Sequence, residues 1–195
     1  MGSTPAQDRP RAGILALQGD FEAHAKLVRR VGGAPVEVRV PRDLEGLDAL
    51  IIPGGESTVM TLGIEREGLA DPIRALIAAG TPVLGTCAGM IMLDRDHLGV
   101  LDVATRRNAF GRQLRSFEAE VELEGVEGGP MHAVFIRAPW VTAHGGGVEV
   151  LGSLDEHPVA IRQGNVLAVA FHPELADDPR LHRLLLSANG RPYSI

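Results

Sequence analysis

The chain has 195 residues, of which 45% are hydrophobic and 23% are charged, and its formal net charge is −6 at pH 7. This length suits one globular domain with a buried core, and an acidic balance with both signs of charge interspersed disfavours a nucleic-acid-binding surface. The apolar runs are too short to span a bilayer, so we expect no membrane association. A single cysteine excludes an intramolecular disulfide and suits a cytoplasmic location.

Residues 1–11 are polar and contain two prolines, which predicts a flexible N-terminal tail before a single domain over residues 12–195. The next segments alternate between two patterns. Short buried runs predict strands at 13–17, 35–40, 49–52 and 82–86. Helical spacing and capping signals predict helices over 20–31, after Ser57, and from 71 to 80. This alternation implies a mostly parallel central sheet with helices on both faces.

The second half of the chain is richer in strand patterns, separated by Gly-rich turns. We expect strands at 114–123, 133–136, 148–151, 159–162 and 166–170. These strands are predicted to be antiparallel additions to the sheet. An amphipathic helix over 178–186 follows them. The predicted fold class is therefore α/β, with three layers and a mixed sheet.

Cys87 stands between a predicted strand and a predicted helix, in the sequence GTCAG at 85–89. Glycines on both sides of a central side chain are typical of a nucleophile elbow, in which a strand turns sharply into a helix. A thiol placed there lies at a helix N-terminus, where backbone N–H groups favour negative charge. The alternative is a buried structural cysteine, and Cys87 alone does not decide between them.

His172 and Glu174 are two residues apart near the end of the chain. If the preceding strand continues through them, both side chains point the same way. An imidazole can accept a thiol proton, and a carboxylate behind it fixes the imidazole tautomer. Each residue taken separately could instead be a structural histidine or a solvated charge. With Cys87 they supply a nucleophile, a base and an orienting group.

A glycine-rich segment, PGGEST at 53–58, follows the strand predicted at 49–52. If that strand neighbours the one ending before Cys87, the backbone N–H of Gly54 or Gly55 could join that of Ala88 in an oxyanion hole. The alternative is a tight turn in which Ser57 caps the next helix.

Six motifs in order resemble one known family. They are LQGD at 17–20, PGGEST at 53–58, GTCAG at 85–89, RNAFGRQ at 107–113, FIRAP at 135–139 and FHPEL at 171–175. The triad pattern resembles the class I glutamine amidotransferases, and the full set looks like the glutaminase subunits of pyridoxal 5′-phosphate synthases. The resemblance implies a flavodoxin-like sheet and hydrolysis of L-glutamine to glutamate and ammonia through a γ-glutamyl thioester.

The resemblance also implies the role of each site residue. Cys87, His172 and Glu174 form the catalytic triad, and the backbone N–H groups of Gly55 and Ala88 form the oxyanion hole. The residues expected to contact glutamine are Gly55, Glu56, Ser57, Arg107, Ile136 and Arg137. The implied partner is a synthase subunit that receives the ammonia within a hetero-oligomeric complex, and no metal or organic cofactor is implied.

Two other functions remain open at this level. The same elbow could serve a thiol esterase or a peptidase, and a noncatalytic binding protein could retain the fold. The remaining histidines show no metal-ligand spacing, and we assign no catalytic role to His24, His97, His132, His144, His157 or His182. Trp140 is expected to be a packing or turn residue.

Overall fold

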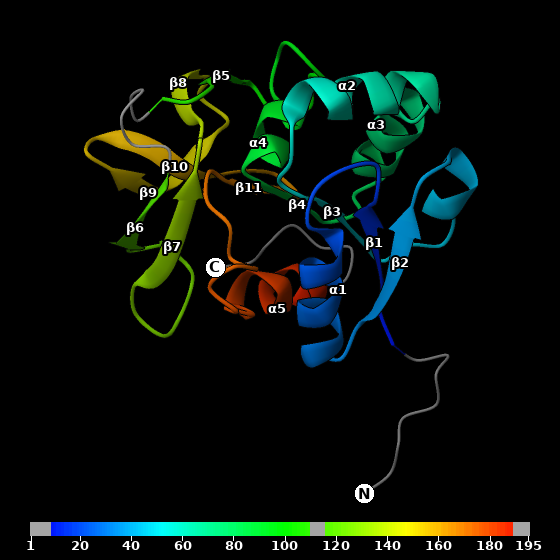
Figure 1. The fold of residues 1–195 in the computed structure, drawn as a ribbon, viewed down its shortest axis with the longest axis horizontal. Helices are drawn as coiled ribbons and strands as arrows, with labels where there is room; N and C mark the ends of the chain where they lie inside the picture. The colour runs from blue at the N-terminus through cyan, green and yellow to red at the C-terminus, as the bar shows by residue number, and fades with distance from the viewer. Residues whose placement is uncertain (1–8, 110–115, 189–195) are drawn as a thin grey trace, which may run out of the picture.

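A computed structural model describes residues 9–109 and 116–188 (Figure 1). Its largest element is a seven-stranded sheet. In spatial order the strands are β2 (Ala34–Val38), β1 (Arg11–Leu15), β3 (Ala49–Ile52), β4 (Val83–Thr86), β11 (Val166–Val169), β10 (His157–Gln163) and β9 (Glu149–Leu154). The strands from β2 to β11 pair in parallel, and β10 and β9 extend the sheet in antiparallel.

Helices cover both faces of the parallel part of the sheet. Figure 1 shows α1 (Phe21–Arg30) and α5 (Arg180–Ser187) on one face and the remaining α-helices on the other, namely α2 (Ser57–Arg66), α3 (Ala70–Ala78) and α4 (Ala88–Leu93). A short 3-10 turn, η1 (Pro41–Leu44), precedes β3. The three-layer α/β fold predicted from the sequence is therefore confirmed.

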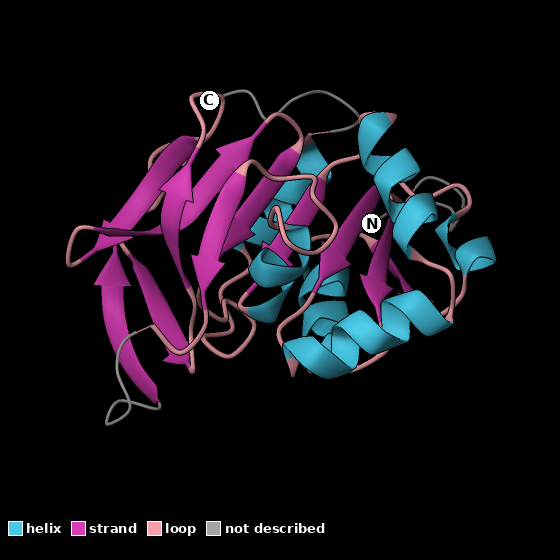
Figure 2. Cartoon of the chain, turned by 90° about the horizontal axis from the view of Figure 1, so that it is seen from above, coloured by secondary structure: helices cyan, strands magenta, loops and turns pink. Residues whose placement is uncertain are grey.

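Two separate antiparallel pairs stand beside the antiparallel end of the sheet. β5 (Val103–Arg106) pairs with β8 (Trp140–His144), and β6 (Ser116–Val121) pairs with β7 (Met131–Ile136). In Figure 2 this end of the molecule is built of strands, whereas the helices gather around the parallel strands.

Several expectations need correction. The strand expected at 166–170 was predicted to be antiparallel, but β11 pairs with β4 in parallel, since an apolar run carries no sign of strand direction. The strands near 114–123 and 133–136 form their own pair outside the main sheet, and β5, β8 and η1 were not predicted. β1 begins at Arg11, one residue before the expected domain boundary. Residues 1–8 of the expected tail and residues 114–115 lie outside the described residues.

The central strands have no solvent-exposed face. Every residue of β3, β4 and β11 is buried, and their sequences are correspondingly almost all apolar. Continuous apolar runs of this kind are typical of parallel strands covered by helices on both sides. None of the helices found between residues 9 and 109 or between 116 and 188 is long and apolar enough to cross a membrane.

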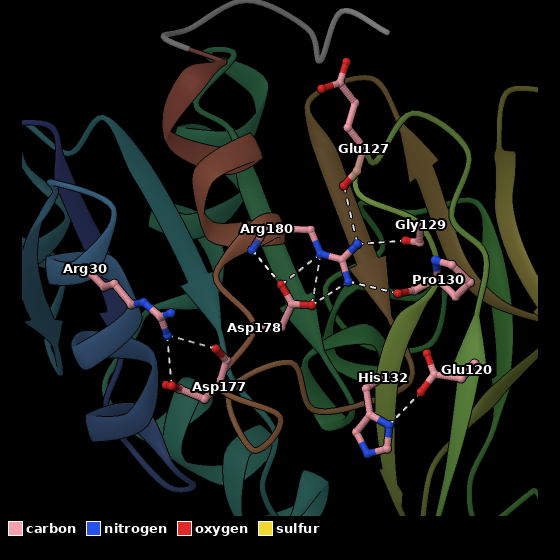
Figure 3. Close-up of polar contacts among 9 residues, drawn as sticks. All are labelled: Arg30, Glu120, Glu127, Gly129, Pro130, His132, Asp177, Asp178 and Arg180. Carbon is pink, nitrogen blue, oxygen red and sulfur yellow. Dashed lines mark hydrogen bonds and ion pairs between the residues drawn. The ribbon is translucent and has the colours of Figure 1, made fainter.

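Arg180, at the start of α5, joins the turn before this helix to the loop between β6 and β7 (Figure 3). Its guanidinium group binds the Asp178 carboxylate, with Nη2 to Oδ2 at 2.7 Å, and donates to the carbonyls of Gly129 at 2.7 Å and Pro130 at 3.1 Å. Nearby, Arg30 on α1 donates to Asp177 at 2.9 Å. The segment between β11 and α5 is thus held to the β6–β7 loop on one side and to α1 on the other.

Arg180→Ala is expected to lower the free energy of unfolding by about 2 kcal/mol, because charge-assisted hydrogen bonds to a carboxylate and to loop carbonyls are lost. Urea unfolding followed by circular dichroism measures the change. Arg183→Ala is the matched control, since Arg183 is exposed on the same helix, and it should cost less than about 0.5 kcal/mol. Equal losses in the two variants would contradict the prediction.

Candidate active site

Cys87 occupies the sharp turn between β4 and α4. Its backbone has φ 49° and ψ −108°, a left-handed conformation that is rare for a residue with a side chain. The Cys87 N–H donates to the Val169 carbonyl at 2.8 Å, which fixes the turn against the end of β11. The Cys87 sulfur lies 3.7 Å from the Ile136 carbonyl oxygen. This is the geometry of a nucleophile elbow.

The pairing of β4 with β11 places His172 beside this elbow. Thr86 lies opposite Val169 in the parallel register, so the residues that follow both strands emerge at the same edge of the sheet. The His172 N–H donates to the Val134 carbonyl of β7 at 2.9 Å, which anchors the backbone of His172.

His172 and Glu174 contact each other, with Nδ1 and Oε1 2.6 Å apart. The structural reason why the two side chains meet differs from the predicted one. β11 ends at Val169, so the two residues lie in a turn, where the Leu175 N–H donates to the His172 carbonyl at 3.2 Å. The expectation that a continuing strand aligns the two side chains was therefore wrong, although the side chains do meet.

At Gly54 the backbone of the glycine-rich turn comes close to Cys87 and His172. A Cβ at this position would overlap the His172 ring and come within 3.3 Å of the Cys87 Cβ, so only glycine allows the turn to approach so closely. The Gly54 N–H donates to Thr86 Oγ1 at 3.1 Å. Of the two glycines considered for an oxyanion hole, Gly54 is thus already engaged.

The pKa values of the His172 and Glu174 pair favour the charged forms. Burial is the largest influence on His172 and opposes its protonation, but hydrogen bonds with Cys87 and Glu174 and their negative charges together raise its pKa to about 10. Burial likewise opposes ionisation of Glu174, yet the hydrogen bond to His172 leads the contributions that lower its pKa. His172 is therefore held as an imidazolium at neutral pH, between the sulfur and the carboxylate.

A cavity of about 440 Å³ opens above Cys87 and His172. The structure brings to its wall every residue expected to contact glutamine, namely Gly55, Glu56, Ser57, Arg107, Ile136 and Arg137. Ala88 also lines it, and its N–H belongs to the first turn of α4, where the helix supplies no acceptor. The volume suits a small polar metabolite.

The start of α2 differs from the prediction that Ser57 caps it. Glu56 is the N-cap, and its carboxylate oxygens accept the N–H groups of Thr58 at 3.1 Å and Val59 at 2.8 Å. These hydrogen bonds lower the Glu56 pKa. A longer carboxylate side chain has displaced the serine from this role, and Ser57 is the first, buried residue of the helix.

Both arginines expected at the site reach the cavity. Arg107 lines the cavity and donates to Thr58 Oγ1 of α2 at 3.3 Å. Arg137 follows β7 in a left-handed conformation with φ 46°, next to the Ile136 carbonyl that lies 3.7 Å from the Cys87 sulfur. Two guanidinium groups therefore give this part of the wall a positive charge.

Gln18 and Asn108 also line the cavity, and neither was assigned a role from the sequence. Gln18 Oε1 accepts the Glu56 N–H at 2.6 Å, which connects the end of β1 to the glycine-rich turn. The signal was its place shortly after the parallel strand β1, at the edge of the sheet where site residues gather. Within residues 9–109 and 116–188, no three His, Cys, Asp or Glu side chains are arranged to hold a metal ion.

The chain is similar to known proteins in both sequence and fold. The model of the SNO glutamine amidotransferase family matches residues 14–189. A protein of Frankia alni named pyridoxal 5′-phosphate synthase subunit PdxT is 53% identical over 91% of this chain and 94% of its own length. The protein of that name from Thermus thermophilus is 52% identical, over 91% and 97%. A crystal structure of a glutamine amidotransferase covers 92% of this chain and 98% of its own, with 48% identity and a TM-score of 0.86.

The His172 ring is expected to titrate near pH 10, and Cys87→Ala should lower that midpoint because the hydrogen bond and the negative charge of Cys87 are removed. NMR of ring-labelled histidine measures the titration. The signals of the exposed His132, whose pKa is raised by Glu120 and Glu118, serve as the internal control and should be the same in the two proteins. An unchanged His172 midpoint in the variant would show that Cys87 does not act on the imidazole.

Proposed function

This chain belongs to the SNO glutamine amidotransferase family, and on that premise we propose that it is the glutaminase subunit of a pyridoxal 5′-phosphate synthase. It is an enzyme that acts on glutamine. The near-complete alignment with proteins named as PdxT subunits supports the assignment to vitamin B6 synthesis. A catalytic thiol also needs a reducing compartment, so we place the activity in the cytoplasm.

The observation that carries the proposal is the position of His172. Its Nδ1 lies 2.6 Å from Glu174 Oε1, while hydrogen bonding to Cys87 on its other side helps to raise its pKa. A histidine held between a sulfur and a carboxylate is the arrangement that thiol nucleophiles need. The cavity above it opens directly to Cys87.

The proposed chemistry is acyl transfer in two steps. The Cys87 sulfur, its proton held by His172, attacks the side-chain amide carbon of glutamine, and His172 then protonates the departing nitrogen so that ammonia leaves. A water molecule activated by the same imidazole hydrolyses the γ-glutamyl thioester, which releases glutamate and restores the thiol. The ammonia passes to the synthase subunit.

The backbone would stabilise the oxyanion of both tetrahedral intermediates. We assign this task to the N–H groups of Ala88 and Gly55, because both residues line the cavity and Gly54 already donates to Thr86. One such donor is typically worth about 3 kcal/mol in the transition state.

Charge complementarity supports the binding of a free amino acid. Arg107 and Arg137 can pair with the α-carboxylate, and the Glu56 carboxylate can accept from the α-ammonium with the lone pairs that its two backbone hydrogen bonds leave. Gly55, Ser57 and Ile136 would complete the wall around the side chain. The interior of a peptide or a simple ester does not carry a free carboxylate and a free ammonium on the same carbon atom.

Cys87→Ala is expected to reduce glutamate release from glutamine by at least about a thousandfold, because no other residue can form the thioester. The assay runs with and without a pyridoxal 5′-phosphate synthase subunit from a relative, and its addition should raise the rate of the unaltered protein. Circular dichroism of the variant verifies folding. Persistent turnover by Cys87→Ala would refute the mechanism, and hydrolysis of esters or peptides without glutamine turnover would favour a different hydrolase.

Arg107→Gln is expected to raise the KM for glutamine by about tenfold with a smaller change in kcat, because it removes a charge-assisted contact with the substrate. Arg106→Gln is the matched control: Arg106 is the neighbouring exposed residue and lies outside the cavity wall. Steady-state kinetics of both variants test the assignment. Equal KM values for the two variants would remove Arg107 from the binding site.

A further inference from the structure

Two histidines lie buried behind the triad, on the face of the sheet covered by α1 and α5. His24 of α1 and His182 of α5 are both 0% exposed. The helices lie side by side in Figure 1, and the rings meet with His24 Nδ1 2.8 Å from His182 Nε2. Burying two imidazole rings costs free energy unless their nitrogens have polar partners, so the partners of this pair indicate its role.

His24 faces two residues of the active-site framework with its other nitrogen. Its Nε2 lies 3.3 Å from Glu174 Oε2, the carboxylate oxygen turned away from His172, and 3.2 Å from Thr86 Oγ1. Thr86 Oγ1 in turn accepts the Gly54 N–H. One ring therefore stands between the triad carboxylate and the glycine-rich turn.

Two proton arrangements fit the hydrogen bonds of this pair: His24 carries its proton either on Nε2, or on Nδ1 with Nε2 accepting from the Thr86 hydroxyl. Within the described residues, Glu174 Oε2 has no well-aligned hydrogen-bond partner, and His24 Nε2 lies 3.3 Å from it. The proton on Nε2 is favoured, because a nitrogen lone pair this close to a carboxylate oxygen would be repelled. His24 Nδ1 then accepts from His182 Nε2, and His182 Nδ1 is left as an unpaired acceptor, which agrees with its lack of a partner in the same residues.

Burial keeps both rings neutral. It lowers the pKa of His24, against the opposing charge of Glu174, and it lowers the pKa of His182 to about 3. The other charged groups whose fields reach the two rings are His172, Asp20 and Asp178. A neutral His24 can offer a polar N–H to the carboxylate without neutralising the charge that His172 requires.

We propose that His24, oriented by His182, is a positioning residue for the reaction: its Nε2–H holds Glu174 Oε2 and Thr86, and so keeps the carboxylate aimed at His172 and the glycine-rich turn beside Cys87. The kinetic part of this inference rests on the proposed glutaminase function. The structural part does not, because it concerns the contacts of His24 and the reactivity of Cys87.

Two substitutions separate the two nitrogens of the His24 ring. The amide of His24→Gln reaches the place of Nε2 and can still donate to Glu174, whereas the shorter amide of His24→Asn takes the place of Nδ1 and keeps only the contact with His182. Both variants bury an amide in the same site, so both should lose similar stability. Urea unfolding of each measures that loss and makes each variant the control for the other.

Two readouts distinguish positioning from packing. The first is the pH dependence of Cys87 alkylation by iodoacetamide, followed by mass spectrometry, which is unambiguous because the chain has a single cysteine. The second is kcat and KM for glutamate release, measured with the synthase subunit present.

In His24→Asn the rate of Cys87 alkylation at neutral pH should fall by about tenfold, since a displaced carboxylate stabilises the His172 imidazolium beside the sulfur less. Its kcat should fall by about tenfold or more, with KM within about twofold, in line with the loss of a group that orients a catalytic residue. His24→Gln should keep the wild-type alkylation profile and a kcat within about threefold.

The proposal is overturned if the two variants give the same alkylation profile and kcat, whether both wild-type or both impaired, or if His24→Gln is the more damaged. If the unaltered protein releases no glutamate, the proposed function fails, and the alkylation profiles alone still decide whether His24 positions the triad.

Discussion

The parallel pairing of β4 with β11 is the constraint on which the candidate site depends. Thr86 lies opposite Val169, so the elbow at Cys87 and the turn that carries His172 and Glu174 leave the sheet side by side. The Cys87 N–H closes this arrangement by donating to the Val169 carbonyl. A shift of one residue in the register would turn the side chains of β11 to the opposite faces and carry the imidazole away from the sulfur. The burial of every residue in both strands makes such a shift expensive.

Local patterns in the sequence were sufficient for the first half of the fold and insufficient for the second. The strand at 49–52 was predicted with its observed bounds, and glycine and proline signals located α3 within two residues. β5 and β8 were not predicted because most of their residues are exposed or partly exposed and their pairing joins distant segments. The direction of β11 was predicted wrongly for a related reason, because tertiary packing decides which strands pair. Glu56 replaced Ser57 as the cap because both its oxygens can reach the backbone of α2.

The residues of the site likewise fall into those that the sequence could predict and those that it could not. The glycines around Cys87 and the spacing of His172 and Glu174 carry chemistry that can be recognised in a linear sequence, although a turn rather than a strand brings the last two together. His24 carries no such signal. It occupies the buried face of an amphipathic helix, where a histidine reads as an ordinary packing residue, and its partners come from β4, α5 and the turn after β11. The packing of α1 against the sheet and against α5 makes it a neighbour of Glu174.

Glu174 shows how one buried carboxylate can act on three imidazoles with opposite results. His172 contacts it directly and also faces Cys87, so its pKa rises to about 10 in spite of burial. His182 is separated from it by His24, so burial prevails and its pKa falls to about 3. The penalty for burying charge is large at all three rings. The distance of each ring from Glu174 and the number of its negative partners therefore decide which pKa rises and which falls. The cationic histidine therefore lies on the side of the carboxylate that faces the cavity, where it can donate a proton to a leaving group. The neutral pair behind the carboxylate contributes polar contacts and packing but no charge.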